Sequence, residues 1–254
     1  MTTLASANIL YTLAAPQAAE ALELVLAEEP DLVALQEWYV SRLPILRRYG
    51  DVRLATVGRL PSVPVPAGRG GSSYHWVTTL ADGNGVGARA DRFDLLEARA
   101  VLNVGPARSE RPDRFLRTEP PRFVALGIFR DRVVDRTVAV ISYHLSAGVQ
   151  SRGRYRADRP LLAARHQQEI RGLERLVAEL QRDGHVVHAA GDSNLDGLRL
   201  AGLTSAWVGR EDEPGTHGRG KRKIDDVHGP GPALDVRRVV TASDHQAILV
   251  TRKD

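Results

Sequence analysis

The spacing of apolar positions at the start of the chain predicts a strand, a helix and a second strand. Residues 3–10 form an apolar run, residues 16–29 place apolar side chains on one helical face behind a proline, and residues 32–36 form a second run. Strands connected by one helix run parallel and end at the same edge of a sheet. Asn8 and Glu37, which stand near the ends of the two runs, are therefore expected at one edge.

Later segments combine a hairpin with a long helix. Residues 122–144 alternate around the charged turn RDRVVDR, which predicts two antiparallel strands. The strongest helical periodicity covers residues 161–182 and stops before Gly184. Apolar runs at 185–190 and 246–252 predict further strands. Helices interleaved with parallel and antiparallel strands indicate an α/β fold with a mixed sheet.

Two segments rich in proline and glycine, 58–73 and 105–122, interrupt these patterns. We expect both to be surface loops. The first is not expected to be a linker, because neither of its flanks looks able to bury a core alone. The 254 residues are thus expected to form a single domain, 1–254.

Composition excludes several kinds of chemistry. The chain has no cysteine, which rules out disulfides, zinc–thiolate sites and thiolate nucleophiles. It has no basic leader and no apolar run of roughly 18–20 residues, so we expect a cytoplasmic protein away from membranes. We also expect a monomer without an obligatory protein partner. The net charge of +4 favours a polyanion such as nucleic acid, although a GC-rich genome would also explain why only three of 35 basic residues are lysines.

Polar residues at the strand ends carry the candidate chemistry, and each has a structural alternative. Asn8 could form a turn, and Glu37 could simply face solvent, but a carboxylate at a sheet edge also suits Mg²⁺. His144, at the end of VAVISYH, could be structural or could donate a hydrogen bond to a phosphate oxygen.

The stretch HAAGDSNLDG places three acidic or amide side chains within five residues. In an extended backbone, the alternate spacing of Asp192 and Asn194 points both to the same side, where they could contact one substrate atom. Asp196 has the same phase, but it stands beside a glycine, where capping a short helix is the simpler interpretation.

Two further motifs, KIDDVHG and SDHQAILV, lie near the end of the chain. Both could be ordinary loops. Alternatively, Asp244 could bind metal while His245 contacts phosphate and Asp225 orients and charges that imidazole.

The order of these motifs resembles the endonuclease/exonuclease/phosphatase superfamily, the deoxyribonuclease I-like metallophosphoesterases. A strand-end Asn, the Glu of LQE, the His of SYHLSAG, and then GDSN, KIDD and SDH follow one another from Asn8 to His245, each at a predicted strand end. The resemblance implies an α/β fold built as a four-layer α-β-β-α sandwich of two mixed, mostly antiparallel β-sheets flanked by helices. It also implies phosphoester hydrolysis with a divalent metal ion, Mg²⁺ or alternatively Mn²⁺.

The resemblance assigns a role to each motif residue. Glu37 would be the principal metal ligand, with Asn8 and Asp244 near the metal. Asp192 would activate the attacking water, and Asn194 would steady the phosphorane-like transition state. The residues that would contact the phosphate, or orient a group that does, are His144, His245 and Asp225.

Three positions depart from the superfamily pattern. Leu10 stands where some nucleases carry a further metal-side Asp, which increases the reliance on Glu37. His217 and Asp226 stand where aromatic residues are usual. Contacts to the substrate are therefore less well defined than the catalytic centre.

Two basic stretches, 151–159 and 218–223, are expected at the catalytic edge. They favour a nucleic-acid backbone, with a tyrosine on which a base could stack. The candidate substrate contacts are Arg152, Arg154, Tyr155 and Lys221. A nuclease acting on DNA or RNA is the leading function. A phosphatase or a lipid or small-molecule phosphodiesterase is the first alternative, and an inactive member that only binds nucleic acid is the second.

Overall fold

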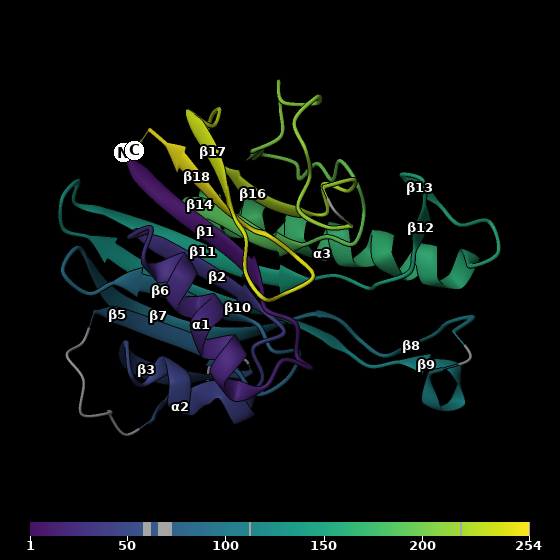
Figure 1. Ribbon diagram of the computed structural model, residues 1–254, viewed down its shortest axis with the longest axis horizontal. Helices are drawn as coiled ribbons and strands as arrows, with labels where there is room; N and C mark the ends of the chain where they lie inside the picture. The colour runs from purple at the N-terminus through teal and green to yellow at the C-terminus, as the bar shows by residue number, and fades with distance from the viewer. Residues whose placement is uncertain (58–61, 66–72, 112, 219, 254) are drawn as a thin grey trace.

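Two β-sheets pack face to face in the computed structural model, which describes residues 1–57, 62–65, 73–111, 113–218 and 220–253 (Figure 1). The first sheet has the strand order β17 (Asp235–Val239), β18 (Ala247–Arg252), β1 (Thr2–Asn8), β2 (Leu32–Gln36), β6 (Gly85–Arg89), β5 (Tyr74–Thr79) and β3 (Gly50–Val57), with β4 (Val63–Val65) beside β3. The second has the order β15 (Thr204–Ser205), β16 (Asp225–Gly229), β14 (Val186–Asp192), β11 (Arg136–His144), β10 (Arg122–Asp131) and β7 (Phe93–Val104). The end of β3 pairs with β7 and joins the two sheets.

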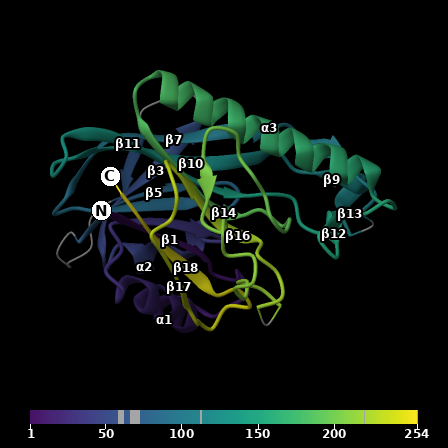
Figure 2. The ribbon, with the colours of Figure 1, turned by 90° about the horizontal axis from the view of Figure 1, so that it is seen from above.

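Helices cover the outer face of each sheet, as Figure 2 shows. α1 (Ala15–Leu26) and α2 (Leu43–Leu46) pack on the first sheet through an apolar cluster that includes Trp38. α3 (Pro160–Arg182) packs on the second through a cluster of leucine, isoleucine and valine side chains. A further cluster, which includes Phe129, fills the space between the sheets. The layer order is therefore α-β-β-α, as predicted.

The helices form where their end signals predict. α1 has a proline in its first turn, and the side chain of Gln17 accepts a hydrogen bond from the backbone N–H of Ala14 (3.2 Å). α3 ends before Gly184, whose φ of +86° is readily adopted only by glycine. The predicted helix over 16–29 ends earlier, at Leu26.

The predicted strand pairings are present in both sheets. β1 and β2 run parallel, with Asn8 opposite Gln36. β10 and β11 form the predicted antiparallel hairpin, and β11 runs parallel to β14, with His144 opposite Asp192. Because β1, β2, β11 and β14 finish at the same end of the sandwich, the motif residues gather there.

The two segments predicted as loops contain short strands. Within 58–73, Val63–Val65 pairs with β3, while 58–61 and 66–72 lie outside the described residues. The segment 105–122 holds β8 (Ala107–Arg108), the 3₁₀ turn η2 (Phe115–Arg117) and β9 (Thr118–Glu119). Strands of two or three residues are too short to show alternation in the sequence, so composition alone predicted loops.

A second ribbon, β12 (Gln150–Ser151) and β13 (Arg154–Tyr155), projects beyond the sheets at the same end as β8 and β9, and the two chain ends lie together at the opposite end (Figure 1). Among the helices that the structure describes, none combines the length and the apolar character needed to span a bilayer.

Candidate active site

Strand ends from both sheets meet around Asp192. Asn8, at the end of β1 in the first sheet, donates from Nδ2 to Asp192 Oδ2 in the second (3.0 Å). Asp225 lies opposite Asp192 in the pairing of β14 with β16. The Nε2 atoms of His144 and His245 lie 3.6 Å and 3.8 Å from Asp192 Oδ2. The structure thus brings five of the predicted site residues together.

Asp192 is only 2% exposed. Its Oδ1 accepts a hydrogen bond from the backbone N–H of Asn194 (2.7 Å). Burial and the negative charge of Asp225 raise the pKa of Asp192 to about 7, although His245 and the hydrogen bonds from Asn194 and Asn8 act in the opposite direction. A carboxyl group with a pKa near neutrality is suited to accept a proton from water.

Asp225 and His245 form a charge-assisted pair. Asp225 Oδ2 accepts a hydrogen bond from His245 Nδ1 (2.8 Å) and another from the hydroxyl of Thr216. Burial lowers the pKa of His245, but the hydrogen bond to Asp225 and the charges of Asp225, Asp192 and Asp244 outweigh burial and raise the pKa to about 9. His245 is therefore an imidazolium at neutral pH. Because Nδ1–H is held by Asp225, Nε2–H is the donor that remains for a substrate.

His144, unlike His245, is uncharged. Burial, reinforced by the positive charges of Arg122 and His245, lowers the pKa of His144 to about 3. Its imidazole is neutral at physiological pH and has a single N–H. The site therefore pairs one charged and one neutral histidine around Asp192.

Asn194 lacks the geometry predicted from its spacing. β14 ends at Asp192 and Asn194 has a φ of +52°, so the two side chains do not share a face of an extended strand. Asn194 Nδ2 instead donates to the carbonyl of Leu145 (3.1 Å) and fastens this turn to the end of β11. The prediction for Asp196 was also wrong, since residues 197–203 contain no helix and its Oδ1 accepts the backbone N–H of Lys223 (2.7 Å).

Oxygen atoms suited to a divalent metal stand at the ends of β1 and β2. Asn8 Oδ1 is buried and has no hydrogen-bond partner among the described residues. Glu37 follows Gln36, the residue opposite Asn8, and its Oε2 accepts the backbone N–H of Tyr11 (2.8 Å). A buried amide oxygen without a partner beside a carboxylate fits a hard cation, because Mg²⁺ and Mn²⁺ prefer oxygen ligands.

Two compact groups of acidic and histidine residues could also hold a metal ion. In the part of the chain that the structure describes, two groups of acidic and histidine residues have ligand atoms within 4.8 Å of one another, namely Asp192 with Asp225 and His245, and His217 with Asp244 and His245. Glu37 belongs to neither group. Asp244 is exposed, and its Oδ2 lies 3.6 Å from His217 Nε2.

Comparison with known proteins identifies the fold. No family model and no curated protein matches the sequence. Among solved structures, D. rerio TDP2 complexed with single strand DNA product is 16% identical, with coverage of 98% of this chain and 97% of that chain and a TM-score of 0.64. A mannosyl-6-phosphatase from Bacteroides thetaiotaomicron is 16% identical (99% of each chain, TM-score 0.61), and an endonuclease/exonuclease/phosphatase family protein from the same organism is 16% identical (98% and 96%, TM-score 0.60). The chain has the deoxyribonuclease I-like fold of these proteins.

On this deoxyribonuclease I-like fold, two residues that the sequence does not single out hold the end of β1. Ser243 Oγ donates to the carbonyl of Asn8 (2.7 Å). The buried guanidinium of Arg42 donates to the carbonyls of Ile9 (2.6 Å) and Leu10 (2.7 Å). The position of Ser243 inside the SDH motif is the one sequence signal for it, whereas Arg42 has none.

Two of the three departures from the superfamily pattern, His217 and Asp226, have different consequences. The ring of His217 lies against that of His245, with centroids 4.4 Å apart, and accepts a hydrogen bond from Arg222. His217 thus adjoins His245. Asp226 is buried and accepts hydrogen bonds from Ser205 Oγ (2.6 Å) and the backbone N–H of Ala206 (3.1 Å), so it stabilises β15 and not a substrate.

Three of the four predicted substrate contacts are exposed, and the fourth is hydrogen-bonded within the protein. Arg152 and Arg154 are exposed on the β12–β13 ribbon, and Lys221 is exposed in the turn that leads to Arg222. Tyr155 is partly buried, and its hydroxyl lies 2.9 Å from His166 Nδ1.

His166 links this tyrosine to the turn that follows β14. Its Nε2 lies 2.7 Å from the carbonyl of Ser193, which can only accept, so Nε2 carries the hydrogen. Nδ1 then accepts the hydroxyl hydrogen of Tyr155. Because Ser193 lies between Asp192 and Asn194, the ribbon is connected to the turn that holds the proposed base.

Proposed function

We propose that the protein is a divalent-metal-dependent phosphodiesterase that hydrolyses nucleic acid by in-line attack of a water molecule activated by Asp192. The observation that carries the proposal is the arrangement around Asp192: a buried carboxyl group with a pKa near neutrality, held by Asn8 and the Asn194 backbone, with two histidine Nε2 atoms within 3.8 Å. General bases work best when their pKa lies near the working pH.

The roles of the chain's own groups follow from their charge and position. Asp192 takes a proton from water as the water oxygen bonds to phosphorus and the opposite phosphorus–oxygen bond breaks. Positively charged His245, fixed by Asp225, donates from Nε2 to a phosphoryl oxygen. Neutral His144 offers a second contact to the phosphate, and Asn194 keeps the catalytic turn against the end of β11.

Asn8 and Glu37 are the groups that we expect to hold a divalent cation. The cation would offset negative charge on the phosphoryl oxygens. Asp244 offers a further oxygen on the exposed side, beside His217.

Charge and fold support a nucleic-acid substrate. Arg152, Arg154 and Lys221 are exposed on two segments that adjoin the site, where guanidinium and ammonium groups can bind phosphates. The structure of D. rerio TDP2 with a single-strand DNA product is consistent with this choice. The mannosyl-6-phosphatase, which has the same fold, favours the alternative of a phosphatase or a small-molecule or lipid phosphodiesterase.

A substrate panel tests the proposal. The purified protein and an Asp192→Asn variant would be incubated with plasmid, single-stranded DNA, RNA, bis(p-nitrophenyl) phosphate and a hexose 6-phosphate, in Mg²⁺, in Mn²⁺ and in chelator. We expect metal-dependent cleavage of DNA or RNA by the wild type only. Turnover restricted to the hexose phosphate would favour the phosphatase, and binding of nucleic acid without any turnover would indicate the inactive binding protein.

A further inference from the structure

A narrow arm projects past the site end of the sandwich and carries exposed apolar side chains at its tip. It comprises β8, η2 and β9, and it appears at the right of Figure 1. Phe115 is 85% exposed and Leu116 76% exposed. Adjacent apolar side chains with this degree of exposure are a feature of interaction surfaces.

The base of this arm is fastened beside the catalytic residues. Arg111 Nη1 donates to the carbonyl of Ala147, three residues after His144 (3.4 Å). Glu110 accepts the backbone N–H groups of Leu161 (2.7 Å) and Leu162 (3.1 Å) and so caps the first turn of α3. A ligand that extends from the scissile phosphate toward β8 and β9 would therefore meet the arm.

The backbone at the tip holds the apolar side chains outward. Leu116 and Arg117 have φ values of +51° and +50°, a left-handed conformation that is unfavourable for residues other than glycine. Hydrogen bonds from the Arg117 N–H to the Arg114 carbonyl (2.9 Å) and from the Ser109 N–H to the Arg117 carbonyl (2.8 Å) maintain it. The backbone conformation of the tip thus keeps Phe115 and Leu116 exposed.

Of the arginines on the arm, two are paired with acidic residues and two are available to a ligand. The paired ones are Arg111, which binds Asp113 (2.7 Å), and Arg114, which lies 3.4 Å from the buried Glu119. Among the described residues, the side chains of Arg108 and Arg117 have no ion pair or hydrogen bond. Both of them line a cavity of about 260 Å³ together with Ser109, Glu110, Leu116 and Leu161.

We infer that the arm binds a single-stranded stretch of nucleic acid, with Phe115 and Leu116 packed against an unpaired base and Arg108 and Arg117 on neighbouring phosphates. The inference rests on the proposed function in that it takes the substrate to be nucleic acid. Unpaired bases expose the flat faces that an aromatic ring can stack on, and arginine binds phosphate oxygens as a planar fork. One aromatic and one aliphatic side chain give little apolar area for a membrane, whereas they match the size of one base.

Binding without turnover tests the inference apart from catalysis. Fluorescence anisotropy in chelator would measure the affinity for labelled 20-nucleotide oligothymidylate and oligouridylate at several salt concentrations. A variant with Phe115→Ser and Leu116→Asn should bind about 10-fold more weakly, the effect of about 1.4 kcal/mol from one stacked base. Asparagine tolerates the positive φ at position 116, so the variant should retain its unfolding temperature.

Matched variants separate the contributions of the arm. A variant with Arg108→Ser and Arg117→Ser should lower the slope of log affinity against log salt by roughly 1.4, because each phosphate contact on a single strand contributes about 0.7. Val133→Ser, at an exposed apolar position in the β10–β11 turn, should bind as the wild type does. All variants should hydrolyse bis(p-nitrophenyl) phosphate at the wild-type rate if the protein hydrolyses it.

Each outcome has a defined meaning. Weaker binding by the arm variants supports the inference even if no substrate is cleaved, in which case the proposed activity fails and the binding surface stands. The inference is overturned if neither oligonucleotide binds, if the arm variants bind as tightly as the Val133→Ser control, or if sedimentation with phosphatidylglycerol vesicles depends on Phe115 and Leu116 while oligonucleotide binding does not.

Discussion

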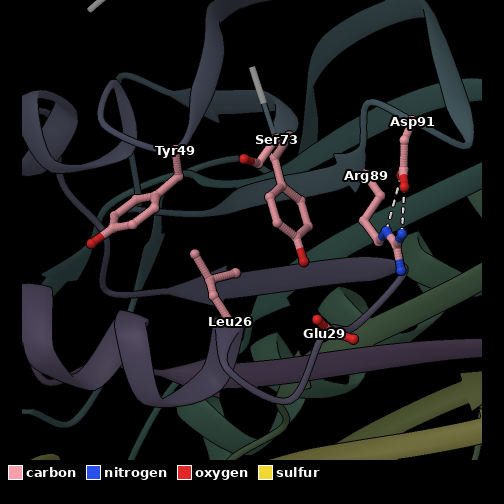
Figure 3. Close-up of a pocket in the computed structure, with 7 residues that line it drawn as sticks. Leu26, Glu29, Tyr49, Ser73, Arg89 and Asp91 are labelled. Atoms are coloured by element: carbon pink, nitrogen blue, oxygen red, sulfur yellow. Dashed lines mark hydrogen bonds and ion pairs between the residues drawn. The ribbon is translucent and has the colours of Figure 1, made fainter. Parts of the chain in front are cut away.

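The two ends of the sandwich differ in how their polar groups are partnered. At the end away from the site, a cavity of about 440 Å³ lies among Leu26, Glu29, Tyr49, Ser73, Tyr74, Arg89 and Asp91 (Figure 3). Four of its polar side chains have partners within the protein: Arg89 pairs with Asp91 (3.0 Å), and the hydroxyls of Tyr49 and Tyr74 donate to the Glu23 carboxylate (2.5 Å) and the Pro30 carbonyl (2.8 Å).

At the site end, by contrast, acidic groups are buried close to one another. Asp192 and Asp225 lie in register on adjacent strands, and the charge of Asp225 raises the cost of ionising Asp192. Asn8 Oδ1 and Asp225 Oδ1 are buried without hydrogen-bond partners among the described residues. Polar groups with partners are ordinary at a protein surface, whereas buried charges and unpartnered oxygens cost folding free energy and are therefore candidates for a functional role. The comparison therefore supports the group around Asp192 as the candidate for chemistry.

Removal of the proposed base should have the largest effect. Asp192→Asn keeps the shape of the side chain but removes the proton acceptor, so we expect the rate of phosphodiester hydrolysis to fall by about 10³-fold. The unfolding temperature should stay equal or rise, because the repulsion with Asp225 is relieved. Steady-state kinetics and thermal unfolding measure the two effects.

Asp91→Asn is the matched control at the other end. It changes the same functional group in an exposed pair, so activity should remain at the wild-type level. Equal losses of activity in the two variants would contradict the distinction between the ends.

Substitution of the proposed metal ligand should give the next largest effect. Glu37 has a φ of +57° and stands at the site end, while Glu29 has a φ of +51° and lines the far cavity. We expect Glu37→Gln to raise the Mg²⁺ concentration for half-maximal activity by at least about 10-fold, because a metal oxygen ligand loses its charge. Glu29→Gln should leave the titration unchanged. An unaltered Mg²⁺ titration in Glu37→Gln would remove this residue from the metal site.

Local patterns in the sequence predicted the parallel β-α-β start, the hairpin and α3, because each depends on periodicity within one segment. They also placed Asn8 and Asp192 at strand ends. The turn at Asn194 and the contacts of Arg42 were not predictable in this way. A positive φ just past a strand leaves no periodic signal, and Arg42 reaches carbonyls about 30 positions away, which only the folded chain brings near.

A smaller effect is expected from His166, which supports the site end. Burial lowers the pKa of His166, against the weaker influences of the Ser193 carbonyl and Glu169. Since the folded-state pKa lies below the unfolded value of 6.5, the folded state resists protonation. Its stabilising contribution is complete above pH 6.5 and is lost as the pH falls toward the folded-state pKa, by at most about 1.4 kcal/mol per pH unit.

His166→Gln removes the titrating group but retains an amide that can donate to Ser193. The variant should be less stable than the wild type by about 1–3 kcal/mol at pH 7, because the hydroxyl of Tyr155 loses its acceptor. The difference should shrink between pH 7 and pH 5, as only the wild type loses the contribution of a neutral imidazole. Urea unfolding at both pH values measures it, and a difference that stays constant would contradict the assignment.

The smallest effect should come from the far cavity. Arg89 and Asp91 are partly exposed, so solvent screens their attraction and the pair should contribute no more than about 1 kcal/mol to the free energy of unfolding. A double-mutant cycle with Arg89→Ala and Asp91→Ala measures this coupling, and both variants should cleave nucleic acid at the wild-type rate. A loss of cleavage in either variant would mean that the far cavity takes part in substrate binding. The partnering of polar groups would then fail to distinguish this cavity from the group around Asp192 and Asp225.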